Sequence, residues 1–349
     1  MDMKRDYYED VQLFSSGVVV CWFLLLMAFL AVFPFLFKNY YVYVANYIAI
    51  NVIVVMGLNI LVGYTGQISL GHAGFFAIGA YGTITLMTLA HLPFLLALFL
   101  AGLAAAFLGF LLGLPALRLE GPYLAIATLG FGVSITQVIG KIEMFGGRQG
   151  LNAPDLTIGP WNLDTDRDFY YLVMVITVLL FIFARNLIKT KVGRAFIAIR
   201  DADIAAETMG VNLLYYKTLA FAVSAFYAGI GGGLYAFVLR FIEPELFSLF
   251  MSVMFLTMAV VGGLGSVMGP IAGACLLGWL DLELRNILSV PYLGGWLKSL
   301  SESYFSLTGV SNIQFIVFGL ILVLIMVFEP HGIYGFWIRT KKYWKTWPF

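Results

Sequence analysis

The chain has 349 residues, of which 61% are hydrophobic and 11% are charged, and its mean hydropathy is +0.94. Soluble domains carry about 25% charged residues, so this composition excludes a soluble globular protein and indicates a chain surrounded by membrane lipid. The net charge is only +1, and the few basic residues lie at the ends of apolar runs, which excludes a nucleic-acid-binding face.

Taken in chain order, the apolar runs predict an all-α, polytopic transmembrane helical bundle of about ten spans. The first run, residues 17–37, is too long for the core of a signal peptide. Residues 39–117 contain no Asp, Glu, Lys or Arg, and at about 20 residues per span they hold three crossings. The remaining six spans are expected at residues 123–139, 169–188, 218–239, 247–261, 267–288 and 314–328.

Two glycine-rich stretches interrupt this pattern, one from Gly63 to Gly74 and the other from Gly262 to Gly273. Either stretch is expected to contain a broken or re-entrant helix, which a membrane tolerates only where protein or a cavity covers the backbone. Both stretches share the pattern Val-Gly-x-x-Gly. That echo fits a chain built from two related halves, although glycines are also enriched in membrane helices generally.

Charge asymmetry between the loops predicts the orientation. Residues 185–217 carry six basic and three acidic residues, and residues 331–349 carry four basic residues and no acidic one, so both segments are expected in the cytoplasm. Residues 141–168 carry three basic and five acidic residues and are expected outside. Ten spans with both termini cytoplasmic satisfy all three assignments, and residues 1–349 are expected to form a single membrane domain.

No constellation of catalytic or metal-binding residues is apparent in the sequence. The histidines His72, His91 and His331 lack metal-ligand spacing, and Cys21 and Cys275 fit small packing residues. The chain also lacks the G-x-x-x-x-G-K-[ST] pattern that cradles ATP phosphates. We therefore expect no enzymatic activity, metal or cofactor in this chain, and we expect any ATP to bind a partner subunit.

Five polar residues inside the apolar runs are candidates for a translocation path: Asn59, Gln67, Ser69, His72 and Thr128. Gln67, Ser69 and His72 are the best of them, because small side chains let a ligand or a facing helix approach the backbone, and residues 63–82 are rich in these. The alternative is structural, since uncharged polar groups often join membrane helices at about 0.6 kcal/mol each.

The charged segment 190–217 is predicted to be a cytoplasmic loop that a partner protein grips. We expect Asp201 or Asp203 to cap a short helix over residues 203–209, and Gly210 to end it. Ala205 and Ala206 would give this helix a small surface that suits a groove. An ordinary positively charged loop is the alternative. The residues assigned to this coupling loop are Gly193, Arg194, Arg200, Asp201, Asp203, Ala205, Ala206 and Gly210.

Motifs in the loop and beyond it occur in a fixed order. They are Gly193-Arg194-Ala195, Ala198-Ile199-Arg200-Asp201, Ala205-Ala206, Gly121-x-Tyr123-Leu124-Ala125-Ile126 and Val260-Val261-Gly262-Gly263-Leu264-Gly265-Ser266. In order and spacing the chain resembles, over residues 46–335, the LivH/LivM family of permease subunits of branched-chain amino-acid ABC importers, and the LivM type in particular. The loop is similar to the coupling helix of ABC permeases, whose pattern is Glu-Ala-Ala-x-x-x-Gly, with Ile204 at the Glu position.

The resemblance implies an inner-membrane permease subunit without enzymatic chemistry of its own. It implies four kinds of partner: membrane lipid, a second LivH-like permease, two ABC ATPase subunits that bind ATP, and a periplasmic substrate-binding protein. The implied substrate is a branched-chain or other apolar amino acid, and an importer of urea or short amides is the alternative. Two further classes differ in what they require: an ion-coupled secondary transporter needs an intramembrane ionisable site, and a membrane enzyme needs a polar catalytic cluster.

Overall fold

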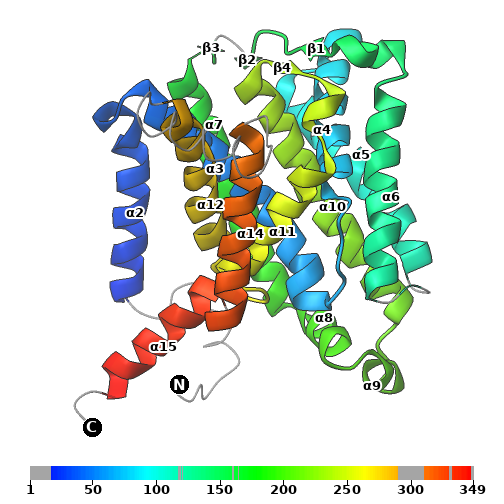
Figure 1. The fold of residues 1–349 in the computed structure, drawn as a ribbon, viewed down its shortest axis with the longest axis vertical. Helices are drawn as coiled ribbons and strands as arrows, with labels where there is room; N and C mark the ends of the chain where they lie inside the picture. The colour runs from blue at the N-terminus through cyan, green and yellow to red at the C-terminus, as the bar shows by residue number, and fades with distance from the viewer. Residues whose placement is uncertain are drawn as a thin grey trace, which may run out of the picture.

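The computed structural model describes residues 17–116, 119, 121–158, 161–163, 165–289, 310–329 and 332–346. Its long helices stand side by side as a bundle (Figure 1), which confirms the predicted all-α polytopic class. They are α2 (Gly17–Leu36), α3 (Asn39–Asn59), α4 (His72–Leu89), α5 (Phe94–Ala116), α6 (Pro122–Ile139), α7 (Asp166–Lys189), α10 (Leu213–Leu239), α11 (Leu249–Gly262), α12 (Gly269–Ser289) and α14 (Val310–Phe328).

Each predicted span overlaps one of these long helices, and the three crossings predicted within residues 39–117 are α3, α4 and α5. Eight helical segments of the described chain are long and apolar enough to cross a membrane. The other two long helices are α2, whose apolar stretch Val20–Leu36 is shorter, and α12, which carries Asp281 and Glu283. Both run alongside the rest of the bundle (Figure 1), so the chain is a multi-pass membrane protein.

Helix α10 lies at the centre of the bundle and packs against α3, α4 and α5. Glycines make this close packing possible. A side chain at Gly232 of α10 would overlap the carbonyl group of Phe76 in α4, and a side chain at Gly79 of α4 would overlap the carbonyl group of Gly229 in α10. In lipid, where water does not drive helices together, such close backbone approach supplies the packing energy that holds the helices.

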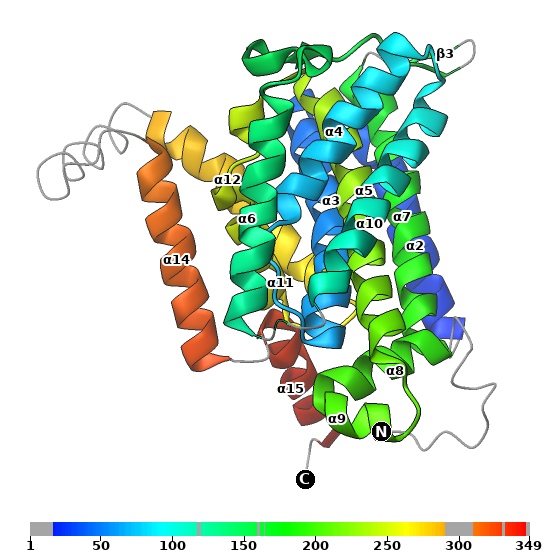
Figure 2. The same ribbon diagram turned by 90° about the vertical axis from the view of Figure 1, so that its right-hand side faces the viewer.

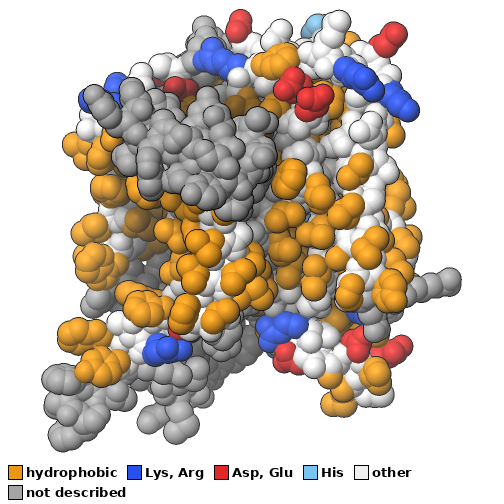
Figure 3. All heavy atoms as spheres, viewed as in Figure 1, with side chains coloured by type: hydrophobic (Ala, Val, Ile, Leu, Met, Phe, Trp, Pro, Cys, Tyr) orange, Lys and Arg blue, Asp and Glu red, His pale blue; other side chains and the backbone are white. Residues whose placement is uncertain are grey.

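The two ends of the bundle differ in structure. At the first, which we call the α9 end, lie the short helices α8 (Lys191–Asp201), α9 (Asp203–Thr208) and α15 (Gly332–Thr346) (Figures 1 and 2). The opposite end, the β1 end, carries the strand pairs β1 (Leu151–Asn152) with β4 (Phe241–Ile242) and β2 (Thr157–Ile158) with β3 (Trp161–Asn162). Apolar side chains cover the middle of the face seen in Figure 3, and charged ones gather toward its two ends.

This arrangement agrees with the charge pattern of the sequence. The described parts of the basic segments 185–217 and 331–349 lie together at the α9 end, whereas the acidic segment 141–168 lies mainly at the β1 end (Figure 1). Residues 331 and 347–349 of the tail lie outside the described residues. The structure therefore separates the two kinds of loop as the predicted orientation requires.

The two glycine-rich stretches contain irregular connections between membrane helices. After α3, the π-helical turn η1 (Ile60–Tyr64) leads to residues 65–71, which we call connection 1, and α4 follows. Residues 66–71 of connection 1 are non-helical and span about 20 Å when extended. The chain therefore passes from the α9 end into the bundle before α4 begins (Figure 1). Residues 263–268, connection 2, join α11 to α12. Both predicted breaks are present, and each separates two membrane helices.

Candidate functional site

A cavity of about 460 Å³ opens toward the β1 end, between α6, the start of α4 and the start of α11. The short 3-10 turn η4 (Pro244–Leu246) closes part of its wall. Its volume lies in the range of small-molecule sites. Its lining residues are Leu70, Ala73, Leu129, Gly132, Val133, Thr136, Gln137, Gly140, Lys141, Arg148, Pro244, Glu245, Phe247, Ser248, Leu249 and Ser252. We call this space the β1-end cavity.

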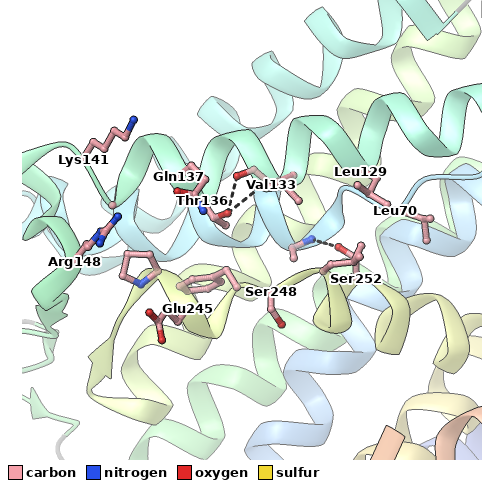
Figure 4. A pocket seen from close by; sticks show the side chains of 16 residues that line it. Leu70, Leu129, Val133, Thr136, Gln137, Lys141, Arg148, Glu245, Ser248 and Ser252 are labelled. Carbon is pink, nitrogen blue, oxygen red and sulfur yellow. Dashed lines mark hydrogen bonds between the residues drawn. The ribbon is translucent and has the colours of Figure 1, made fainter. Parts of the chain in front are cut away.

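The β1-end cavity is charged at one end and largely apolar at the other (Figure 4). Figure 4 shows Lys141, Arg148 and Glu245 together at one end, with Leu129 and Leu70 at the opposite end. Thr136, Gln137 and Ser248 lie between them. The cavity therefore offers both charge signs, several hydrogen-bonding groups and an apolar surface to one small molecule.

A buried polar network lies next to the apolar end of this cavity and includes two predicted pathway residues. The ring of His72 is fully buried, with its Nδ1 atom 3.2 Å from Ser69 Oγ and its Nε2 atom 2.7 Å from Ser224 Oγ of α10. Ser69 Oγ also accepts the backbone N–H of Gly71 at 3.4 Å. In this structure Ser69 and His72 thus join connection 1 to α10 and present no free polar atom to a cavity.

Two hydroxyl groups hold the backbone of connection 1 and the start of α4. Thr128 of α6 accepts the backbone N–H of Leu70 at 3.0 Å, and Ser252 of α11 accepts the backbone N–H of Ala73 at 2.9 Å. Irregular backbone inside a membrane needs such partners, because water is not there to supply them. Thr128, a predicted pathway residue, is fully buried and serves here as an anchor between helices.

Gln67, another predicted pathway residue, faces a second cavity, of about 280 Å³, on the α9 side of connection 1. Its Nε2 atom donates to Thr65 Oγ1 at 3.0 Å, and its buried Oε1 atom has no hydrogen-bond partner among the described residues. Arg200 and Lys217 line the same space, which we call the α9-end cavity. Connection 1 therefore lies between two cavities: Leu70 lines one, and Thr65 and Gln67 line the other.

Asn59, the fifth predicted pathway residue, links the two connections. Its Oδ1 atom accepts the backbone N–H of Gly265 at 3.0 Å, and its Nδ2 atom donates to the carbonyl oxygen of Ser266 at 2.7 Å. A side chain at Gly63 would overlap both Asn59 and the backbone of Gly265. The glycine-rich stretches, about 200 residues apart in the sequence, thus meet at one buried junction near the α9 end.

The predicted coupling loop forms two helices, α8 and α9. Thr190 caps α8 by accepting the N–H of Val192 at 3.3 Å, and a side chain at Gly193 would overlap the carbonyl group of Ile188. Arg194 is exposed and donates to the carbonyl oxygen of Lys189 at 3.4 Å. Gly193 therefore allows the close turn from α7 into α8, and Arg194 remains at the surface.

Helix α9 ends one residue earlier than predicted. Gly210 follows it with a φ of 87°, in the left-handed region that glycine adopts freely, and the N–H of Val211 donates to the carbonyl oxygen of Ala206 at 3.0 Å. The residue before α9 is Ala202, which makes no side-chain cap. Asp203 begins the helix instead, and its carboxylate accepts the N–H of Ile204 and lies 3.4 Å from the ammonium group of Lys217.

The expected outward surface of α9 needs a correction. Ala205 is exposed, as predicted, but Ala206 is buried against the chain itself. The large side chains that project into solvent are Ile204, which is 77% exposed, and Met209, which is 86% exposed. Helix α9 itself lies at the lower end of the bundle in Figure 2. Contacts with α8 and α10 decide which face of this six-residue helix is buried. The sequence pattern does not reveal those contacts.

Arg200 connects the coupling loop to the buried junction. Its Nη1 atom donates to the carbonyl oxygen of Gly63 at 3.1 Å, and its Nε and Nη2 atoms donate to the carboxylate of Asp201 at 3.0 and 2.9 Å. The guanidinium group also lies so close to Gly265 that a side chain there would crowd it. Arg200 of α8 thus contacts both glycine-rich stretches, through Gly63 and Gly265.

Several lining residues of the β1-end cavity were not predicted as site residues. Gln137 is a polar residue in a predicted span, but Thr136, Glu245, Ser248 and Ser252 carried no signal of their own. One signal was available on α6: the lining residues at positions 129, 132, 133, 136, 137 and 140 follow helical spacing and form one face. The partners of that face on α11 are far away in the sequence.

A polytopic helical bundle with a cavity on each side of an irregular intramembrane connection, and with a charged helical loop at one end, has the architecture of a membrane transport subunit. Comparison with known proteins gives the particular family. The chain matches, over residues 40–327, the family described as the permease component of branched-chain amino acid transport systems, and it belongs to that family. It is thus a permease subunit of an ABC importer, a class that works with other ABC transporter components.

The most similar relatives include two bacterial proteins named high-affinity branched-chain amino acid transport system permease protein LivM. The one from Salmonella typhimurium is 34% identical over 305 residues, which covers 78% of this chain and 71% of the relative. The one from Escherichia coli is 34% identical over 304 residues with the same coverage. A probable branched-chain amino acid transport permease protein LivM from Methanocaldococcus jannaschii is 23% identical over 249 residues, covering 68% of each chain.

Proposed function

We propose that this chain is the LivM-type permease of an ATP-driven importer that carries branched-chain amino acids across the inner membrane. The substrate class follows from the names of its relatives, which share 34% identity over more than two thirds of their length. The observation that carries the mechanism is the contact between Arg200 of the coupling loop and Gly63 beside connection 1. It joins the surface that a motor would move to the segment that separates the two cavities.

The partners in this proposal are a second, LivH-like permease, two ATPase subunits and a periplasmic binding protein. The ATPase would bind ATP, because this chain lacks a phosphate-cradling motif. Ile204 and Met209 project from the α9 end as large apolar side chains on a charged loop. Such side chains are suited to insertion into a groove of a partner, which makes them the proposed contact with the ATPase.

In the proposed transport cycle, connection 1 is the barrier between the β1-end cavity and the α9-end cavity. In this cycle, Ser69, His72 and Thr128 would hold the barrier closed through their hydrogen bonds in connection 1 and to α10. Gln67 lines the α9-end cavity, the proposed cytoplasmic side, and Asn59 links the end of α3 to connection 2. Docked ATPase subunits would move α8 and α9, and Arg200 would transmit this movement to the base of the barrier.

Substitution of Met209 tests the coupling assignment. In the reconstituted importer, Met209→Asp combined with Ile204→Asp is expected to abolish ATP-driven uptake and to reduce co-purification of the ATPase, because two charges would enter an apolar contact. Both side chains are exposed, so the protein is expected to remain folded in the membrane. Met209→Leu serves as the matched control and is expected to retain uptake. Normal uptake by the double aspartate variant would refute the docking surface.

A screen of ligands for the co-purified binding protein tests the substrate. Leucine, isoleucine and valine are expected to bind best. Preferential binding of urea or short amides would instead favour the related class of importer and would reject the branched-chain assignment.

A further inference from the structure

We infer that the β1-end cavity is a binding site for the free amino acid as a zwitterion, in which Arg148 and Lys141 take the carboxylate, Glu245 takes the ammonium group, and α6 takes the aliphatic side chain. This inference rests on the proposed function and adds to it a site, the roles of its residues and a rule for selectivity. A substrate released at the β1 end would meet this site before it meets connection 1.

The charges at the mouth of the cavity are placed for such a ligand. Lys141, Arg148 and Glu245 line one end of the same cavity, and none of the three forms an ion pair within the described part of the chain. Both charge signs thus face one small space without neutralising one another (Figure 4). Arginine suits a carboxylate in particular, because its planar fork donates two parallel hydrogen bonds.

The backbone fixes Arg148 and Glu245 relative to each other. Arg148 lies in a tight turn between Gly146 and Gly150, whose φ values are 71° and 81°, and a side chain at Gly150 would overlap the carbonyl group of Ile242. The next residues form β1, which pairs antiparallel with β4, and β4 leads directly to Glu245. The cationic and anionic groups therefore stand on two segments that hydrogen bonds tie together, a preorganised arrangement that reduces the entropy cost of binding.

The deeper part of the cavity suits an aliphatic side chain. Leu129 and Val133 of α6 and Leu70 of connection 1 supply apolar surface. Gly132 also lines this part, and a Cβ there would lie 3.2 Å from the Cα atom of Gly71. The hydroxyl groups of Thr136 and Ser248 lie between the charged and apolar ends (Figure 4), so a molecule with two adjacent charges and one branched apolar group matches the cavity along its length.

The expected affinity is low. Lys141, Arg148 and Glu245 are all exposed, and solvent screens exposed charges, which limits what each contributes. A transit site needs this property, because a substrate that binds too tightly does not leave. Selectivity then comes from the need for both charges: a ligand that lacks one leaves the opposite group of the site without a partner.

Protection of an introduced cysteine tests the site directly. In the assembled importer with Cys21→Ser and Cys275→Ser, Ser248→Cys places a thiol in the middle of the cavity, and a small water-soluble methanethiosulfonate reagent reports its exposure. At about ten times its dissociation constant, leucine is expected to slow this reaction about tenfold. At the same concentration, 4-methylpentanoate and 3-methylbutylamine, which lack the ammonium group and the carboxylate respectively, are expected to protect far less.

Gln149→Cys is the matched control, because it lies on the same turn as Arg148 but does not line the cavity; leucine is expected to leave its reaction rate unchanged. Combining Ser248→Cys with Glu245→Gln should remove the advantage of leucine over 4-methylpentanoate. Equal protection by leucine and both analogues, or no protection by any of them, would overturn the site. ATP-driven leucine uptake by the same complex, measured in parallel, separates that failure from failure of the proposed function, which would show as loss of uptake.

Discussion

Each of the two glycine-rich connections joins two membrane helices, but different kinds of hydrogen bond stabilise them. Connection 1 is an extended segment that hydroxyl groups on other helices hold, as the contacts of Thr128 with Leu70 and of His72 with Ser224 show. Connection 2 is a compact turn that holds itself: Ser266 Oγ donates to the carbonyl oxygen of Gly263 at 2.9 Å and accepts the N–H of Gly269 at 2.9 Å.

This difference indicates that the two connections have different roles during transport. The partners of connection 1 and of the first residues of α4 stand on α6, α10 and α11, so the conformation of this segment depends on how those helices sit relative to one another. The hydrogen bonds of the Ser266 hydroxyl group stay within connection 2 and the first residue of α12, so they do not depend on how the other helices sit. We expect connection 1 to rearrange during transport and connection 2 to act as the fixed pivot, joined to it by Asn59.

The largest loss of stability is expected from a side chain introduced beside connection 2, the proposed pivot. A side chain at Gly262 would overlap the carbonyl group of Gly269 and crowd the backbone nitrogen of Gly273. Gly262→Val is expected to destabilise the protein by about 3 kcal/mol, the upper end for overpacking, and to lower both the yield of monodisperse protein in detergent and its thermal midpoint. Gly130→Val is the control, because a side chain at that position meets no atom within 4 Å. Equal yields for the two variants would show that the turn is not rigid.

Breaking the link between the connections is expected to cost somewhat less. Asn59→Leu keeps the volume of the side chain but leaves the N–H of Gly265 and the carbonyl group of Ser266 unpaired. The predicted loss is about 2 kcal/mol, on the order of 1 kcal/mol for each buried group. Thr257→Val, which removes only a bond from a hydroxyl to Val253 within α11, should change the thermal midpoint much less. A smaller shift for Asn59→Leu than for this control would argue against a structural link.

The anchor of connection 1 is tested by a double-mutant cycle. Ser224→Ala leaves the Nε2 atom of His72 without its partner and is expected to cost about 1–2 kcal/mol. Adding His72→Leu to Ser224→Ala replaces both polar groups, so the second change should cost less than it does in the wild-type chain. Thermal midpoints of the four proteins measure this coupling. Strict additivity would mean that the two side chains do not depend on each other.

The smallest effect on stability, with a clear effect on transport, is expected at Arg200. Its side chain is 37% exposed, so Arg200→Lys should change stability by no more than about 0.5 kcal/mol. Lysine cannot bond Gly63 and Asp201 in the same forked geometry, so ATP-driven uptake is expected to fall about fivefold or more. Arg167→Lys, at the exposed start of α7 and away from the coupling loop, should leave uptake unchanged. Equal uptake by both variants would remove Arg200 from the coupling route.

Local signals explain why much of this fold was predictable from the sequence. Apolar runs located the long helices, and the glycines of residues 63–74 and 262–273 marked both connections, because helix formation and its interruption depend mainly on nearby residues. Asn212 is another local signal, and its side chain caps α10 by accepting the N–H of Tyr215 at 3.0 Å. The short helix α9 also formed close to its predicted bounds and ends before Gly210, although the predicted cap by Asp201 or Asp203 did not form.

Contacts between distant segments explain what the sequence did not reveal. Asn59 was predicted as a candidate for the translocation path, and its bonds to residues more than 200 positions away depend on the packing of whole helices. Glu245 and Arg148 come together only through the β1–β4 pair, whose strands are too short to give a pattern. Ala206 was placed on the wrong face of α9 because tertiary contacts set the rotation of a six-residue helix.

Reconstitution tests the central claim most directly. Uptake of labelled leucine should be measured in proteoliposomes that hold either this chain alone or the chain with its second permease and ATPase subunits, with the binding protein outside and ATP inside. The account predicts uptake only in the complete system and only with ATP, because this chain supplies the path and the coupling loop but no motor. Concentrative uptake by the chain alone, driven by an ion gradient, would contradict it.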